Sequence, residues 1–193
     1  PVSADFQYLR PNLVLHLMRN VKDNFRFYDA VRVFEIGTAF TEKSGKFAEI
    51  LTLGMAIGIK KDQSPLLELK GLADELLKQL GLTDYFFRDL DSDLRYLDRE
   101  NSVQIESEHN VIGYIGQSKN DANVAVAELY LDRLLEFVVG EKEYRPLPIF
   151  PSVIRDLSFI VDSGHRIGPV QDLIENASHL LDDVDLLDWF EDE

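Results

Sequence analysis

The sequence predicts an α+β protein in which a mostly antiparallel sheet is flanked by helices and followed by part of a smaller α+β module. Two observations support this prediction. Runs of β-branched and aromatic residues, separated by turn signals, alternate with apolar residues at helical spacing. A stretch with three prolines, residues 140–151, does not fit inside a helix or a sheet. We therefore predict one domain over residues 1–140, a linker over 141–152 and a second, truncated domain over 153–193.

The first domain is expected to begin with a helix and a long hairpin. Apolar residues at helical spacing predict a helix over residues 13–25. A β-branched run at 31–40 and an apolar run at 47–60 flank a polar loop at 41–46. This order predicts two antiparallel strands joined by that loop.

The same patterns predict the remaining elements. An amphipathic run indicates a helix over residues 65–80, and Gly81 is suited to end it. Four further strands and a short helix complete the first domain, at 85–88, 102–106, 111–117, 124–131 and 132–139. A strand, a helix and a second strand are predicted for the second domain, at 154–161, 167–181 and 184–190.

The composition excludes several classes of function. The chain has no cysteine, which rules out disulfides, thiolate metal sites and cysteine nucleophiles. A formal net charge of −15 argues against strong autonomous binding of RNA or DNA. The apolar stretch 50–59 is too short to span a bilayer, and residues 1–12 lack the basic and apolar regions of a signal peptide. We therefore expect a cytoplasmic protein that does not bind a membrane.

An acidic stretch in the first domain imitates a calcium-binding loop. Asp89, Asp91, Asp93 and Glu100 fall at the first, third, fifth and twelfth positions of an EF-hand. The sixth position, which requires glycine for a sharp turn, is Leu94. We therefore interpret the stretch as an acidic surface loop and expect no metal site there.

No other motif indicates catalysis. The chain lacks a phosphate-binding glycine loop and a nucleophile elbow. Gly54 and Gly58 lie in an apolar strand, where close packing explains them better than phosphate binding. Asp182 and Asp183 are adjacent, so their side chains point apart and do not form a catalytic pair. The histidines, none of which is paired with another at a metal-ligand spacing, are His16, His109, His165 and His179.

Blocks of sequence over almost the whole chain follow a recognisable order. They are LRPNLVLHLMRNV (9–21), VRVFEIGTAF (31–40), LKGLADELLKQLGL (69–82), VIGYIGQ (111–117), AVAELYLDRLLE (125–136), YRPLPIFPSVIRDLSFIVD (144–162) and VDLLDWFE (184–191). Together they resemble the C-terminal part of the bacterial phenylalanyl-tRNA synthetase β-subunit family. The resemblance implies a class II synthetase-like antiparallel sheet flanked by helices, followed by a partial β-α-β unit of a ferredoxin-like anticodon-binding domain.

The resemblance also implies that two catalytic motifs are degenerate. Active class II synthetases hold the ATP α-phosphate with an arginine in motif 2, where this chain carries Glu35, with Gly37 two residues later. A carboxylate at that place would repel phosphate. Motif 3 of active relatives has glycines that leave room for the nucleotide, and here Glu128 and Tyr130 stand at those positions.

Two further residues of motif 3, Asp132 and Arg133, persist in this chain. We expect Arg133 to form a structural ion pair and not to bind ATP. No catalytic, cofactor-binding or metal-binding residue is therefore expected here.

The family implies a role for the assembly in which such a chain takes part. Two α and two β subunits attach phenylalanine to its tRNA, and ATP and magnesium serve the holoenzyme through the catalytic α subunit. We expect the chain to pack on that subunit as an inactive scaffold, to contact tRNA only within the complete holoenzyme, and to self-associate when isolated. Two alternatives remain: a stand-alone synthetase-like paralogue acting as a regulatory or interaction module, and an unrelated metal- or ligand-binding α+β protein.

Overall fold

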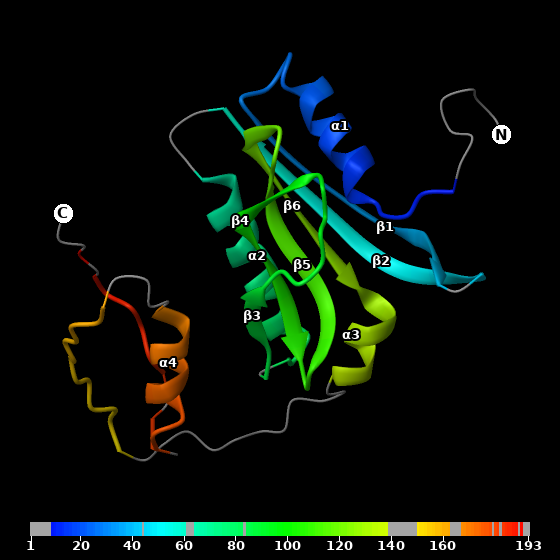
Figure 1. Ribbon diagram of the computed structural model, residues 1–193. Coiled ribbons are helices and arrows are strands. Elements are labelled where there is room, and N and C mark those ends of the chain that lie inside the picture. The colour runs from blue at the N-terminus through cyan, green and yellow to red at the C-terminus, as the bar shows by residue number, and fades with distance from the viewer. Residues whose placement is uncertain are drawn as a thin grey trace. The chain divides into compact units, whose positions relative to one another are not determined.

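The computed structural model describes most of the chain (Figure 1). The described residues are 9–43, 45–60, 64–82, 84–138, 150–162, 167–178, 180–181, 183–188 and 190. The chain divides into two compact units, Pro1–Tyr144 and Arg145–Glu193. Apart from residues 150–152, the predicted linker at 141–152 lies outside the described residues, as do His165, His179 and Asp182.

The first unit is built on an antiparallel sheet of six strands in the order β1-β2-β6-β5-β4-β3. The strands are β1 (Ala30–Lys43), β2 (Lys46–Ile59), β3 (Phe86–Asp89), β4 (Leu97–Ser107), β5 (Asn110–Ser118) and β6 (Asp121–Tyr130). Helices flank this sheet in the first unit. The predicted α+β class with an antiparallel sheet is confirmed.

Helices cover both faces of the sheet (Figure 1). They are α1 (Val14–Asn24), α2 (Pro65–Gln79) and α3 (Leu131–Phe137). Successive residues of β2 show the division, because Ala56 packs in the cluster that contains α1, whereas Ile57 packs with α2 and α3. Each face of the sheet thus buries its own apolar layer.

Two glycines allow α1 to approach the sheet closely. A Cβ atom at Gly54 would lie 2.8 Å from the Cβ of Leu13, and one at Gly58 would clash with Val21 and Phe25. This confirms that the glycines of this strand serve close packing. The helix can lie directly on β2 only because these positions carry no side chain.

The second helix, α2, has the start and the end that its sequence predicts. The Ser64 hydroxyl accepts a hydrogen bond from the Leu67 amide at 3.4 Å, and Pro65 occupies the first turn. Leu69, one of its core residues, is fully buried. Gly81, just beyond the helix, has a φ of +85°, as a glycine that ends a helix requires.

Several strands are longer than predicted. The hairpin strands reach Lys43 and start again at Lys46, which leaves a very short connection in place of the six-residue loop. The strand expected at 102–106 begins at Leu97, which pairs with Ser118 across an irregularity in the register. Polar residues fill this added part of β4 after Leu97, so side-chain periodicity gave no sign of a strand.

The second unit contains one predicted element and corrects two others. Helix α4 (Ile167–Glu175) lies within the predicted helix and ends earlier, where the Asn176 side chain donates to the carbonyl of Asp172 at 2.7 Å. The predicted strands at 154–161 and 184–190 are absent from the described residues of those ranges. Their apolar side chains, including Ile160, stay exposed, and no described neighbour supplies the hydrogen-bonded ladder a strand requires.

In the part of the chain that the structure describes, no helix is both long enough and apolar enough to cross a bilayer.

Candidate functional site

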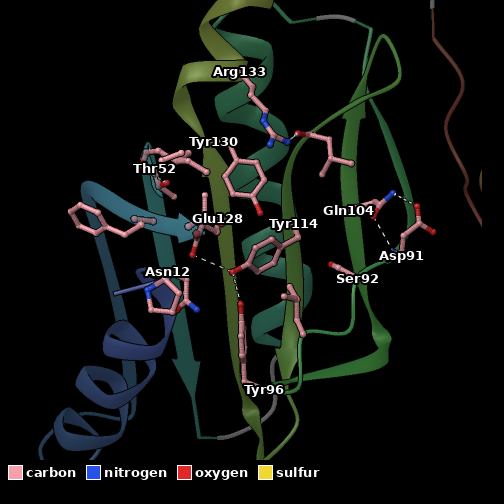
Figure 2. Close-up of a pocket in the computed structure, with 18 residues that line it drawn as sticks. Asn12, Thr52, Asp91, Ser92, Tyr96, Gln104, Tyr114, Glu128, Tyr130 and Arg133 are labelled. Atoms are coloured by element: carbon pink, nitrogen blue, oxygen red, sulfur yellow. Dashed lines mark hydrogen bonds between the residues drawn. The ribbon is translucent and has the colours of Figure 1, made fainter. Parts of the chain in front are cut away.

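A pocket of about 650 Å³ opens on the sheet face that α1 covers (Figure 2). Buried polar side chains from four neighbouring strands face it: Thr52 of β2, Gln104 of β4, Tyr114 of β5 and Glu128 of β6. Residues 11–12, which precede α1, and parts of the segment 91–96 also line it. The pocket therefore gathers polar groups from distant parts of the sequence onto one face of the sheet.

Glu128 lies at the centre of a buried hydrogen-bond network. Its Oε2 atom accepts from the Leu13 amide at 3.2 Å and from the Tyr114 hydroxyl at 3.1 Å. The hydroxyls of Tyr114 and Tyr96 lie 2.8 Å apart, which extends the network toward β4 (Figure 2). Because the first amides of a helix have no partner within it, a carboxylate from β6 satisfies part of the α1 N-terminus.

Burial dominates the electrostatics of this network. It raises the pKa of Glu128 above the ordinary value, and hydrogen bonds from the Leu13 amide and the Tyr114 hydroxyl partly offset that rise. Burial also raises the pKa of Tyr96 to about 12 and that of Tyr114 well above its ordinary value. The tyrosines therefore stay protonated at neutral pH and act as hydrogen-bond donors.

A second polar pair lines the other side of the pocket. The Asp91 amide donates to Oε1 of Gln104 at 3.0 Å, and Nε2 of Gln104 donates to the Asp91 carboxylate at 3.0 Å. Gln104 is 3 % exposed, so its amide is committed to this pair and to Glu106. The pair fixes the loop after β3 against β4.

The motif 2 positions lie outside the pocket. Glu35 accepts a hydrogen bond from Nη1 of Arg10 at 2.6 Å, and Nε of Arg10 donates to the carbonyl of Thr38 at 3.2 Å. A Cβ atom at Gly37 would clash with the Arg10 guanidinium. The Phe40 amide also donates to the carbonyl of Arg10 at 2.9 Å. Gly37 thus makes room for an arginine that fastens the segment before α1 to the edge strand β1.

The last motif 3 residues bind backbone groups. Asp132 accepts from the Leu51 amide at 2.9 Å. Nη1 of Arg133 donates to the carbonyl of Val111 at 2.7 Å, and its guanidinium lies 4.9 Å from the centre of the Tyr130 ring. The prediction that Arg133 forms an ion pair is wrong for the described residues. Its guanidinium contacts a backbone carbonyl and an aromatic ring and no carboxylate of a described residue.

The structure separates the residues of the calcium-like stretch. Asp89 lies in β3 and Glu100 in β4, so they belong to paired strands and not to one loop between helices. His16 lies in α1, and His109 lies in the turn between β4 and β5 with a φ of 67°. Within the described ranges, no group of three acidic or histidine side chains is placed to hold a metal ion.

Comparison with known proteins decides the family. Residues 1–127 match the family described as the phenylalanyl tRNA synthetase beta chain CLM domain. The chain belongs to this family. Phenylalanine–tRNA ligase β subunits of Fusobacterium nucleatum, Thermotoga maritima and Bdellovibrio bacteriovorus are 25%, 26% and 28% identical over 98–100% of the chain. The chain spans about a quarter of their length, 26% in each.

Solved structures support the same fold. A pyrrolysyl-tRNA synthetase from Desulfitobacterium hafniense matches 66% of this chain and 49% of its own, with a TM-score of 0.52 and 19% sequence identity. At that identity the match shows the fold alone. It agrees with the class II synthetase-like sheet expected for this β-chain family.

Sequence reasoning on this β-chain domain missed most of the residues that line the pocket. It singled out Glu128, Tyr130 and Arg133, which the structure brings together as pocket-lining residues. It did not find Tyr96 or Tyr114, which complete the network with Glu128. Alternation along β5 places Tyr114 opposite Glu128, but only the strand register reveals that pairing.

Proposed function

We propose that this chain is part of a phenylalanine–tRNA ligase β subunit and serves as a non-catalytic scaffold. In this proposal it packs on the catalytic α subunit, in a cytoplasmic tetramer of two α and two β subunits that charges tRNA with phenylalanine. ATP and magnesium act at the α subunit, and tRNA is bound only by the complete holoenzyme. The net charge of −15 supports the last point, because it disfavours autonomous binding to a polyanion.

The observation that carries the proposal is the environment of Glu128. It is 2 % exposed and fastened to the Leu13 amide and the Tyr114 hydroxyl. At the motif 3 place where an active synthetase leaves room for a nucleotide, this chain would thus present a buried acidic network. A carboxylate there would repel the phosphate groups of a nucleotide, which supports the proposal that the chain does not bind ATP.

The motif 2 position supports the same conclusion. Glu35 is committed to Arg10, and Gly37 admits that arginine beside β1. In this proposal, the position that binds ATP in active relatives has been converted to a structural contact between the N-terminal segment and the sheet. We therefore propose that the chain by itself does not activate phenylalanine.

Co-expression tests the scaffold role. A tagged full-length β subunit that contains this chain should elute with the α subunit of the same organism in equal amounts, and the complex should charge tRNA. The α subunit alone should elute separately and charge poorly. A β subunit that is folded but never associates with α would support the stand-alone alternative and overturn the proposal.

Steady-state kinetics test the absence of chemistry. Glu35→Gln in the complex should leave kcat for tRNA charging within about twofold of wild type, because loss of a single half-exposed ion pair has a small effect. The complex should co-elute as before. A fall of several orders of magnitude in kcat with intact assembly would show that this position takes part in the reaction.

Without the α subunit, we expect the chain to self-associate through the face that the α subunit would cover. Light scattering on the free chain and on the complex checks this expectation. A monomeric free chain at all concentrations would contradict it.

A further inference from the structure

The pocket on the α1 face is large enough for a ligand. Its volume of about 650 Å³ falls within the range of roughly 300–1,000 Å³ that small-molecule sites occupy. The network of Glu128 and its tyrosines forms one wall and leaves this space open. The pocket therefore has the volume of a small-molecule site, and the carboxylate of Glu128 at a motif 3 position disfavours a nucleotide there.

The charges of the pocket favour a cation. Glu128 and Asp91 contribute two carboxylates, and Arg133 is the one lysine or arginine among the described residues that line it. The Arg133 guanidinium is already occupied by the carbonyl of Val111 and the ring of Tyr130. A phosphate or carboxylate ligand would meet net negative charge, whereas an ammonium group would be attracted.

The remaining walls are apolar and aromatic. Tyr96 and Tyr130 line the pocket, and Pro11 and Ile50 add aliphatic surface. Aromatic faces attract cations, and aliphatic surface favours an apolar ligand body. Carboxylates beside aromatic and aliphatic walls match an amine that carries a hydrophobic group.

We propose that this pocket binds a small organic cation, a primary amine joined to an apolar or aromatic body, with its ammonium group directed to Glu128 and its body against Pro11 and Ile50. The inference is independent of the scaffold role, since a subunit bound to α and a stand-alone module would both present the pocket. It also differs from a vestigial nucleotide site, because the favoured ligand has the opposite charge.

Calorimetric titration of the full-length β subunit, without α, tests the proposal with three probes of similar size. Benzylamine should bind at one site at millimolar concentrations. Benzyl alcohol and benzoate should bind at least about tenfold more weakly, because they lack the charge-assisted hydrogen bond. Failure of benzylamine to bind, or equal binding of the alcohol, would overturn the proposal.

Substitutions locate the binding. Glu128→Gln keeps an acceptor for the Leu13 amide but removes the charge, and should weaken benzylamine about tenfold. Ala48→Trp adds a large ring at an exposed lining position, away from the buried network, and should also abolish binding. Glu49→Gln, an exposed carboxylate next to Ala48 that does not line the pocket, is the matched control and should leave affinity within about twofold.

These variants separate a loss of ligand binding from a loss of folding. Circular dichroism establishes that each is folded, and if Glu128→Gln fails to fold, Ala48→Trp provides the answer. Unchanged benzylamine affinity in folded Ala48→Trp would place the binding elsewhere and refute the site. Loss of association with α alongside normal benzylamine binding would refute the scaffold role alone.

Discussion

The Glu128 carboxylate accepts a hydrogen bond from the backbone amide of Leu13, a residue 115 positions earlier in the chain. This contact fixes the N-terminal end of α1 to β6, near the centre of the sheet. A helix start without such a partner would leave a buried amide unsatisfied. The relationship makes Glu128 a structural residue of the first unit and leads to two predictions.

Glu128→Ala should destabilise the protein. The substitution leaves the Leu13 amide and the Tyr114 hydroxyl without their acceptor, at a cost of about 2 kcal/mol in the free energy of unfolding. Glu128→Gln preserves an acceptor oxygen and should lose less. Urea denaturation followed by circular dichroism measures both. Equal losses in the two variants would contradict the hydrogen-bond explanation.

Stability should also depend on pH through Glu128. Burial raises its pKa in the folded protein, so the folded state holds the proton more tightly than the unfolded chain. Its contribution to stability is complete below the ordinary pKa of a glutamate and is lost as pH rises through the raised, folded-state pKa. The free energy of unfolding of the wild type should therefore fall relative to Glu128→Gln as pH rises from acidic values. Parallel pH profiles in urea titrations would disprove this.

The hydroxyl group of Ser118 should be removable without loss of stability. Its Oγ is buried and has no hydrogen-bond partner among the described residues. Ser118→Ala should leave the free energy of unfolding unchanged or raise it by up to about 1 kcal/mol, because no bond is broken and a buried hydroxyl is removed. Ser102 is the matched control, since its hydroxyl donates to the carbonyl of Asp98 at 2.5 Å. Ser102→Ala should destabilise, and the opposite ranking in chemical denaturation would count against the argument.

Two glycines should respond in opposite directions to alanine. Gly71 lies exposed in α2, where an added Cβ atom meets nothing within 4 Å, so Gly71→Ala should stabilise the protein by about 1 kcal/mol. Gly58→Ala should destabilise it, because the new methyl group meets Val21 and Phe25 of the α1 region. Midpoints of thermal unfolding measure both effects. A stable Gly58→Ala variant would show that α1 can move away from the sheet at little cost.

Local pattern predicted most of the first unit. The amphipathic run and Gly81 predicted α2, and the glycines of β2 predicted close packing against a neighbour. The start of β4 at Leu97 could not be predicted, because polar residues follow it and its place in the strand depends on pairing with Ser118 of β5 and not on side-chain periodicity. The same reason explains the wrong prediction of a strand at 154–161, where the apolar pattern is present and a described partner strand is absent.

The candidate pocket was predictable only in part. The family resemblance drew attention to Glu128 and Tyr130, which are near neighbours in the sequence. Gln104 lies in β4 and Tyr96 lies just before it, and both also line the pocket. Their placement depends on the order of strands in the sheet, which a single sequence does not specify.

The contact of Arg10 with β1 has a consequence for the behaviour of the protein in concentrated solution. An edge strand exposes unpaired amides and carbonyls that can recruit a strand from another molecule. Arg10 uses its own carbonyl and guanidinium to occupy the Phe40 amide and the Thr38 carbonyl on that edge. A variant that lacks residues 1–12 would present this part of β1 as an open template, and we expect it to aggregate more readily than the chain that keeps Arg10.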